Sequence, residues 1–376
     1  MKTYAALILA SAALAQASAS PGPLPAAQAA AEIIKAGAAP AVGVALIRGG
    51  RLAEECVLGV RAKGGASRAR LNDRWHIGSD AKAMTATMIA RLVEKGTLSW
   101  DRPLSRLLPE LATGMRADYR NVTLTDLLAH RAGLQDLIDS DVYEGFYHDK
   151  RALHAQRIDY VRMALSMPPA FPPGTDAKYS NRGTIIAALA AEDATGLSYE
   201  RLMEREVFAP LGMRSATFAR VATGELAGHE KGVAKYGDHS DNPRVDAPAG
   251  EVRLTLDDWA KFAIDQLEGE RGRGRLLKPS TYRFLHTGQA GTIFGLGWGV
   301  RPSLDNVSGR FLTHAGSNGY WYARIVLDAD TENGMLIAAN AGDGGIDQAI
   351  AAVEARLVPT LAEPGGGATL RKCPVR

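Results

Sequence analysis

The chain has 376 residues with 44 Lys and Arg against 41 Asp and Glu, a net charge of +3, and its charges are interspersed without a long basic block. We therefore expect no nucleic-acid partner. The chain carries two cysteines, too few for a disulfide scaffold or a cysteine-based zinc cluster, and its eight histidines lack H-E-x-x-H or comparable spacing, so we expect neither a metal nor another cofactor.

The first 19 residues resemble a secretory signal peptide. A lysine precedes an apolar run over residues 4–15, and cleavage after Ala17 or after Ala19 would satisfy an A-x-A rule. The run is too short to span a bilayer and prolines follow it at once, which makes a retained anchor the weaker interpretation. We expect an exported protein, periplasmic or secreted, with no membrane anchor.

The next segment predicts a helix followed by a hairpin. Residues 26–36 read as a helix, and residues 41–47 and 55–60 read as strands joined through Arg48-Gly49-Gly50. Residues 64–70 read as a loop that leads to another helix.

Ser79 lies three residues before Lys82 at the start of that helix, whose apolar residues recur at three- and four-residue steps until Gly96. Residues three apart are neighbours on a helix, so the Lys82 amine could take the Ser79 proton if burial lowers its pKa. The alternative is a capped surface helix, with Ser79 as N-cap and Lys82 as a solvated charge. Taken alone, S-x-x-K does not decide between them, because this spacing is common by chance.

The middle of the chain is predicted to be mostly helical. Helices are expected over 123–129, 158–165, 184–192, 199–208 and 255–267, with a turn-rich segment at 98–111 and an irregular polar segment at 221–248 that suits the border of a cleft. After Gly295 the pattern predicts strands over 296–300, 310–314, 320–327 and 334–340, a helix over 346–357 and a tail over 363–376.

These elements predict one α/β (α+β) fold. A two-stranded hairpin cannot bury a face by itself, so strands from both chain ends should form a single antiparallel sheet flanked by helices, with an inserted, mostly helical domain. We assign the chain to a signal peptide (1–19), a sheet domain in two segments (20–76 and 246–376) and the inserted domain (77–245). The two domains form a single catalytic unit with a cleft at their seam.

Export would allow Cys56 and Cys373 to pair, because the first lies in an N-terminal strand and the second in a tail that could reach the same sheet. We therefore predict this disulfide. The oligomeric state stays open.

Two further motifs follow Ser79: Tyr179-Ser180-Asn181, before a helix, and His314-Ala315-Gly316-Ser317, between two strands. Each alone is more often structural. In this order, S-x-x-K, Y-x-N and H-x-G resemble the motifs of the serine beta-lactamase and penicillin-recognising superfamily, in the branch that contains class C beta-lactamases, DD-peptidases and related esterases. The resemblance covers nearly the whole chain after the signal peptide, including residues 122–134, 171–181, 210–213, 248–250 and 294–298.

The resemblance implies a beta-lactamase/transpeptidase-like fold and an acyl-enzyme. Ser79 would attack an acyl carbon, with Lys82 and Tyr179 as the proton-transfer pair and the division of work between them open. Asn181 would orient Lys82 or the substrate amide. The backbone N–H groups of Ser79 and Ser317 would bind the oxyanion, the latter placed by a turn at Gly316 on an edge strand. The substrate would be a small ester, amide or peptide.

Two residues depart from the family pattern. His314 replaces a lysine that helps to hold the substrate carboxylate, and Asp80 follows the nucleophile. A neutral imidazole attracts an anion less well than an ammonium, which favours an esterase or amide hydrolase over a DD-carboxypeptidase or a class C-like beta-lactamase. Arg131, Arg182 or Arg324 could replace the missing cation. The non-enzymatic alternative is a binding or sensor protein that is acylated once and stalls.

Overall fold

The computed structural model describes residues 24–135, 140–363 and 369–373. The expected signal peptide, with its cleavage site near Ala17 or Ala19, lies outside the described residues. Among the helices of the described part, none is both long enough and apolar enough to span a membrane.

A seven-stranded sheet with the order β11-β2-β1-β10-β9-β8-β7 forms the centre of the fold. The N-terminal hairpin lies against C-terminal strands, as predicted: Gly43 of β1 pairs with Ala338 of β10. All neighbours are antiparallel except β11, which runs parallel to β2. The strands are β1 (Ala41–Arg48), β2 (Arg51–Gly59), β7 (Gly299–Leu304), β8 (Val307–Ser317), β9 (Tyr322–Asp328), β10 (Asn333–Ala339) and β11 (Arg371–Lys372).

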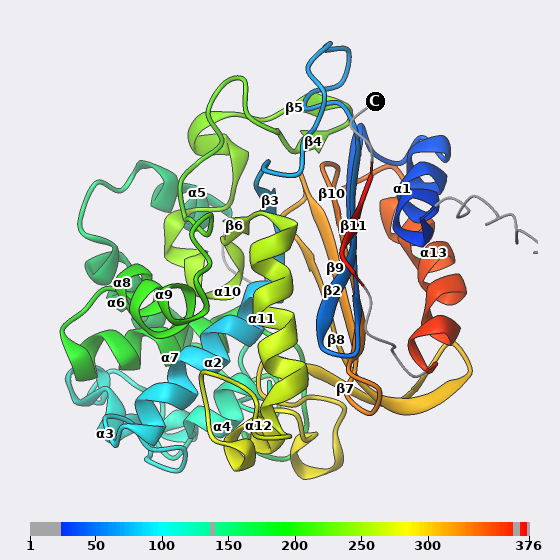
Figure 1. Ribbon diagram of the computed structural model, residues 1–376. Helices are drawn as coiled ribbons and strands as arrows, with labels where there is room; N and C mark the ends of the chain where they lie inside the picture. The colour runs from blue at the N-terminus through cyan, green and yellow to red at the C-terminus, as the bar shows by residue number, and fades with distance from the viewer. Residues whose placement is uncertain (1–23, 136–139, 364–368, 374–376) are drawn as a thin grey trace, which may run out of the picture.

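Helices cover both faces of this sheet (Figure 1). α1 (Pro25–Lys35) and α13 (Ile346–Leu361) pack on one face, and α11 (Leu256–Gly269) packs on the other. Successive side chains of a strand point to opposite faces, so a strand between two helical layers must be apolar throughout. β1 follows this rule: Val42 and Val44 belong to the core beneath α1 and α13, whereas Ala41, Ala45 and Ile47 belong to the core on the α11 side.

The remaining helices form a region beside the α11 face of the sheet (Figure 1). α2, α7 and α10 pack against one another at its centre. The helices are α2 (Ala81–Glu94), α3 (Leu104–Leu107), α4 (Leu124–Leu128), α5 (Ser140–His148), α6 (Leu153–Ser166), α7 (Asn181–Thr195), α8 (Tyr199–Met203), α9 (Ala209–Leu211), α10 (Ala247–Gly250) and α12 (Pro279–Leu285). Two small sheets pair β3 (Trp75–His76) with β6 (Arg253–Leu254) and β4 (His229–Glu230) with β5 (Val233–Ala234).

One hydrophobic core extends from this helical region into the sheet, since Ile186 of α7 and Leu336 of β10 belong to the same buried cluster. The domain boundaries at residues 76 and 246 stay a prediction.

One predicted strand is displaced. The sequence suggested a strand over 296–300, but β7 begins only at Gly299. Gly297 has a φ of +75°, and a Cβ at this position would lie 2.6 Å from the carbonyl oxygen of Lys82. The chain therefore turns tightly against α2 here, which only glycine permits, and becomes a strand afterwards.

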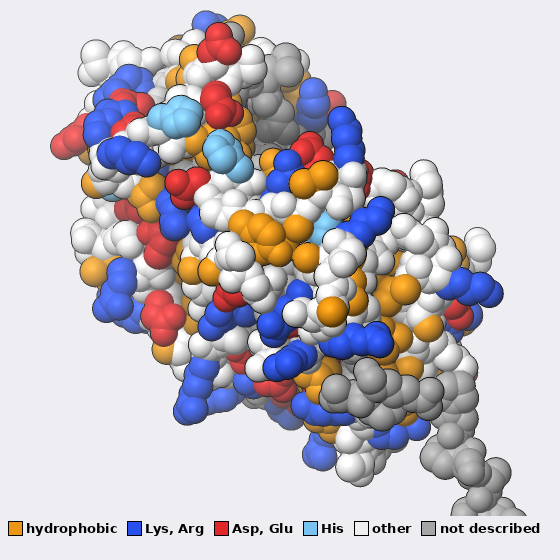
Figure 2. Space-filling view, turned by 90° about the horizontal axis from the view of Figure 1, so that it is seen from above, with side chains coloured by type: hydrophobic (Ala, Val, Ile, Leu, Met, Phe, Trp, Pro, Cys, Tyr) orange, Lys and Arg blue, Asp and Glu red, His pale blue; other side chains and the backbone are white. Residues whose placement is uncertain are grey.

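Charged side chains of both signs share the surface. Figure 2 shows Lys and Arg side chains beside Asp and Glu side chains across the face seen from above. Some form close ion pairs, such as Arg151 with Asp159 at 2.8 Å and Lys235 with Glu230 at 2.7 Å. Opposite charges thus neutralise one another locally, in keeping with the net charge of only +3.

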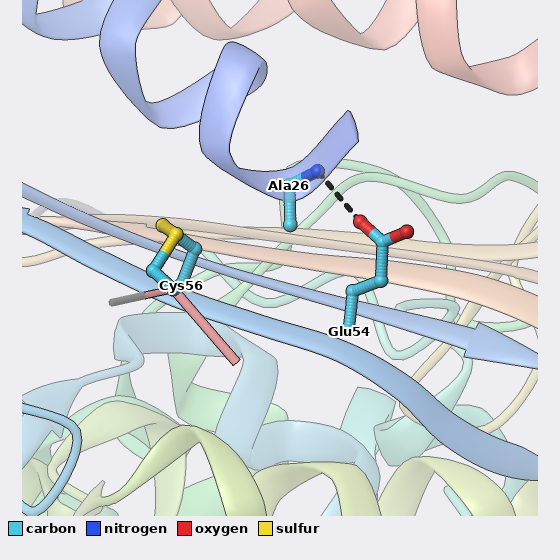
Figure 3. Close-up of a disulfide and its surroundings, with 4 residues drawn as sticks. Ala26, Glu54 and Cys56 are labelled. Atoms are coloured by element: carbon cyan, nitrogen blue, oxygen red, sulfur yellow. Dashed lines mark hydrogen bonds between the residues drawn. A yellow bond between two sulfur atoms is a disulfide. The ribbon is translucent and has the colours of Figure 1, made fainter. Parts of the chain in front are cut away.

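The predicted disulfide between Cys56 and Cys373 is present. Figure 3 shows that Cys56 and Glu54 lie on the side of β2 that faces α1, where the Glu54 carboxylate accepts a hydrogen bond of 2.9 Å from the Ala26 N–H at the start of α1. The bridge and this hydrogen bond hold the C-terminal segment and the first helix against the same strand.

The C-terminal segment forms a strand where the sequence predicted only a tail. Arg371 and Lys372 make up β11 and lie opposite Glu54 and Glu55 of β2. Arg371 forms an ion pair with Glu54, and Lys372 Nζ lies 3.1 Å from Glu55 Oε2. Residues 364–368 of this tail lie outside the described part.

Candidate active site

Ser79 lies in a single 3₁₀ turn, Gly78–Asp80, that continues directly into α2. Lys82 occupies the first turn of α2 and is almost fully buried, with 1% of its surface exposed. Its Nζ donates a hydrogen bond of 2.9 Å to Ser79 Oγ. The spacing of three residues thus brings amine and hydroxyl together, and the solvated lysine of the alternative interpretation is wrong.

Lys82 also donates to two oxygens from distant parts of the chain. Asn181 Oδ1, at the start of α7, lies 2.7 Å from Nζ, and the carbonyl oxygen of Ala249, in α10, lies 2.6 Å away. A charged amine can donate to all three oxygens. In its neutral form it keeps two hydrogens for the oxygens of Asn181 and Ala249 and turns its lone pair to the Ser79 hydroxyl, as a base requires. Asn181 is therefore in direct contact with the amine, while the contribution of Ala249 had no signal in the sequence.

Tyr179 lies beside the same amine, with Lys82 Nζ 5.0 Å from its ring centroid. The ring of His130 packs on Tyr179 with 4.7 Å between centroids, and His130 Nδ1 accepts a hydrogen bond of 3.2 Å from the Ser180 N–H. Burial, together with Lys82 and His314, lowers the pKa of His130 to about 3. His130 is therefore neutral and acts as an acceptor that holds the loop of Tyr179.

The backbone around Ser317 lies directly against the backbone around Ser79. A Cβ on Gly316 would lie 2.7 Å from the Ser79 nitrogen, and a Cβ on Gly78, whose φ is +51°, would lie 2.5 Å from the Ser317 nitrogen. Glycine at both positions permits this approach. The structure thus brings together the two N–H groups that were predicted to bind an oxyanion.

β8 is not the edge strand that we predicted, because β7 lies outside it. The pairing between these strands ends, however, at Gly299 opposite Thr313. Among the described strands, only β9 accompanies β8 beyond that point, up to Ser317. Among the described strands, none therefore lies on the β7 side of the last residues of β8.

The two departures from the family pattern form one pair. His314 Nδ1 lies 3.2 Å from Asp80 Oδ1 and 2.9 Å from the carbonyl oxygen of Ala315. Burial raises the pKa of the Asp80 carboxyl, although His314, Arg324 and Lys82 oppose this shift. Two acceptors thus surround Nδ1, and Nε2 is the ring atom that remains for a ligand.

The three arginines considered as replacement cations each have partners within the protein. Arg324 Nε lies 2.5 Å from Glu354 Oε2, on the α13 side of the sheet. Arg182 is 1% exposed, and Arg131 donates to the carbonyl oxygen of Gly174. The structure therefore supports none of the three as a carboxylate anchor.

Other parts of the described structure offer little for a metal or a second chemistry. Among the described residues, no group of three or more His, Cys, Asp or Glu side chains is placed to hold a metal ion. A cavity of about 710 Å³ lies near the start of α3 and is lined by Arg102, Glu110 and His154, among others, but by none of the predicted site residues.

The comparison with known proteins covers most of the chain. A family model described as Beta-lactamase matches residues 26–358. Penicillin-binding protein 4 of Amycolatopsis lactamdurans is 28% identical over 78% of this chain and 78% of its own length. Unguisins hydrolase ungD of Aspergillus violaceofuscus is 28% identical over 54% of this chain, but the match spans only 38% of that protein. An octameric penicillin-binding protein homologue from Pyrococcus abyssi superposes with a TM-score of 0.70 at 20% identity, covering 87% of this chain and 75% of that one.

Proposed function

This chain belongs to the beta-lactamase family, and from that premise we propose that it is an exported serine hydrolase that forms an acyl-enzyme on Ser79 with a neutral ester or amide. The observation that carries the proposal is the contact of 2.9 Å between Nζ of the buried Lys82 and Ser79 Oγ. A serine hydroxyl is a weak nucleophile until an adjacent base takes its proton, and a positioned amine is such a base.

In the proposed reaction, Ser79 Oγ attacks the acyl carbon while its proton passes to the unit of Lys82 and Tyr179. The negative oxygen of the tetrahedral intermediate lies between the N–H groups of Ser79 and Ser317, each worth about 3 kcal/mol of transition-state stabilisation. The same unit returns the proton to the leaving group as the bond breaks. Water then attacks the acyl-enzyme by the reverse sequence and regenerates Ser79.

A neutral substrate is proposed because the site lacks a fixed cation at the family's lysine position. His314 replaces it and is paired with Asp80 at 3.2 Å. The relative named as a penicillin-binding protein keeps a DD-carboxypeptidase or a beta-lactamase as the second candidate. A stalled binding protein is the third, and the contacts of Lys82 with Ser79 and Asn181 argue against it.

Export is supported by the disulfide between Cys56 and Cys373, since such bonds persist in oxidising compartments and are rare in the cytosol. We propose a periplasmic or secreted location on this ground and on the pattern of residues 1–19.

The test offers p-nitrophenyl butyrate, a D-Ala-D-Ala peptide and the cephalosporin nitrocefin in parallel to the purified protein. We expect the ester to be hydrolysed fastest and a fluorophosphonate to label Ser79, as mapped by mass spectrometry. Ser79→Ala should lose both the turnover and the label. Equal labelling of this variant, or a label on another residue, would contradict the proposal.

A further inference from the structure

A buried hydrogen-bonded chain links the two backbone segments that flank the predicted oxyanion site. Gly78, directly before Ser79, donates its N–H to His76 Nδ1 over 3.0 Å. His76 Nε2 lies 2.8 Å from Asp241 Oδ2, and the other oxygen of Asp241 accepts a hydrogen bond of 2.9 Å from Asn318 Nδ2. The chain therefore begins one residue before Ser79 and ends one residue after Ser317.

The direction of the hydrogens follows from these contacts. His76 Nδ1 accepts from a backbone N–H, so the ring hydrogen lies on Nε2 and is donated to Asp241. Burial alone would raise the pKa of the Asp241 carboxyl, but His76, Arg220 and Asn318 outweigh it and hold the pKa below its ordinary value. Asp241 is thus a carboxylate that accepts from both neighbours, and it fixes the imidazole tautomer.

Both ends of the chain are themselves held in place. Asn318 Oδ1 accepts the N–H groups of Tyr320 and Trp321, each over 3.1 Å, and so closes the turn that follows β8. The Trp321 ring stacks on the His76 ring, with 6.4 Å between the ring centroids and 26° between the ring planes. His76 itself is fully buried. The imidazole is therefore fixed at its edge by Asp241 and across its face by Trp321.

We propose that His76, held by Asp241, is a positioning residue for the oxyanion site. It anchors the Gly78–Ser79 backbone to the Ser317–Asn318 backbone, so that the N–H groups of Ser79 and Ser317 converge on one point. The inference rests on the proposed acyl-enzyme on Ser79. A misplacement of about 1 Å in such a site costs up to about a hundredfold in rate, which is the effect that loss of this anchor should have.

A matched pair of substitutions separates the two halves of the anchor. In His76→Asn the amide oxygen lies near the place of Nδ1 and still accepts the Gly78 N–H, but nothing reaches Asp241. His76→Gln places its amide near Nε2, which keeps the contact with Asp241 and loses the acceptor for Gly78. The control is His286→Gln, another buried histidine that contacts a carboxylate, Glu270, at 2.9 Å.

The measurements are kcat and KM for p-nitrophenyl butyrate, the rate of fluorophosphonate labelling, and the inhibition constant of a boronic acid, which forms a tetrahedral adduct on Ser79. We expect kcat, the labelling rate and boronic acid affinity to fall together, about ten- to a hundredfold, in both His76 variants, with KM little changed. The control should keep all four values. A purely structural role would lower the melting temperature of all three variants alike without this split.

Labelling of the wild-type protein distinguishes failure of this inference from failure of the proposed function. Wild-type labelling of Ser79 together with unchanged rates in both His76 variants would overturn this inference alone. No labelling of wild-type Ser79 would overturn the proposed function and the inference with it. If the His76 variants fail to fold, Asn318→Ala breaks the partly exposed end of the same chain and should show the same loss in kcat and boronic acid affinity; wild-type values there would equally overturn the inference.

Discussion

At the scale of single residues, the Lys82 amine contacts several groups of the candidate site. Lys82 donates to Ser79, Asn181 and the carbonyl of Ala249, and its Nζ lies 5.0 Å from the ring centroid of Tyr179. In the proposed mechanism, Lys82 and Tyr179 together carry the proton from nucleophile to leaving group. Lys82 and Tyr179 should therefore behave as one unit.

We predict that Lys82→Ala and Tyr179→Phe each lower kcat about 10²- to 10⁴-fold, the usual contribution of a positioned acid or base. The double variant should be little slower than the slower single one, because residues that act as a unit are not additive. The measurement is kcat for p-nitrophenyl butyrate in all four proteins. Lys95→Ala, just beyond the other end of α2, is the control. Full additivity would show that the two residues serve separate steps.

A second residue-scale prediction concerns substrate charge. Replacing His314 by lysine supplies a permanent cation, but the Asp80 carboxylate 3.2 Å from the imidazole would partly neutralise it. We expect His314→Lys to raise the ratio of nitrocefin to p-nitrophenyl butyrate hydrolysis, and His314→Lys with Asp80→Asn to raise it further. One charge-assisted contact is worth about 1.5–3 kcal/mol, or about ten- to a hundredfold.

The control is His314→Gln, which keeps the site neutral and should leave that ratio low. The idea fails if wild type already hydrolyses nitrocefin faster than the ester, or if both lysine variants leave the ratio unchanged.

The sequence predicted the meeting of Ser79, Lys82 and Asn181 because their motifs have a fixed order and because S-x-x-K obeys helical spacing. It did not predict the partnership of His76 with Asp241. These residues are separated by 165 positions, and Asp241 lies in an irregular segment where no periodic pattern indicates what a side chain faces. The pairing of Asp80 with His314 was missed because a residue's own helix or strand does not indicate which distant residue it faces, although each residue had been noted separately.

At the scale of elements, helices and strands with a clear apolar period were predictable and those without one were not. α2, α7 and β10 lie within a few residues of their predicted ranges. α12 and β11 were missed: β11 has only two residues and forms because a disulfide and two ion pairs bring it to β2. Contacts that stabilise an element from outside leave no pattern within it.

The prediction at the scale of elements concerns β11, the strand at the edge of the sheet next to β2. Cys56→Ser and Cys373→Ser should each lower the free energy of unfolding by about 2–4 kcal/mol, because the bridge restricts the unfolded chain. The double variant should be no less stable than the single ones. Urea denaturation with and without a reductant measures this, and the reductant should not affect the double variant. Equal stability of wild type and both single variants would show that β11 is held without the bridge.

At the scale of the whole molecule, the predicted single sheet from both chain ends is present, while its division from the helical region remains a prediction. One buried cluster contains Trp75, Trp259, Trp298 and Trp321 together with helices of the other region. Sequence patterns show which face of an element is apolar, but not which other element covers it. A core shared by distant segments could therefore not be predicted from the sequence patterns.

Because the core is shared, we predict one cooperative unfolding transition. In urea, hydrolysis of the ester, tryptophan fluorescence and far-UV circular dichroism should be lost at the same midpoint, since neither region can unfold without exposing apolar surface of the other. The disulfide stays oxidised in this experiment. Separate midpoints for fluorescence and circular dichroism would show two independently folding domains.

The position of the disulfide also has a consequence for biosynthesis. The two cysteines are 317 residues apart, and the chain contains no others. If the chain is exported as we propose, Cys56 emerges long before its partner and stays a thiol while the residues between them are synthesised. No wrong intramolecular bridge is available to it, so isomerisation is never required within one molecule. The incorrect bridge that remains possible joins two nascent chains. We therefore expect a disulfide-linked dimer through Cys56 as the by-product when many chains are exported at once.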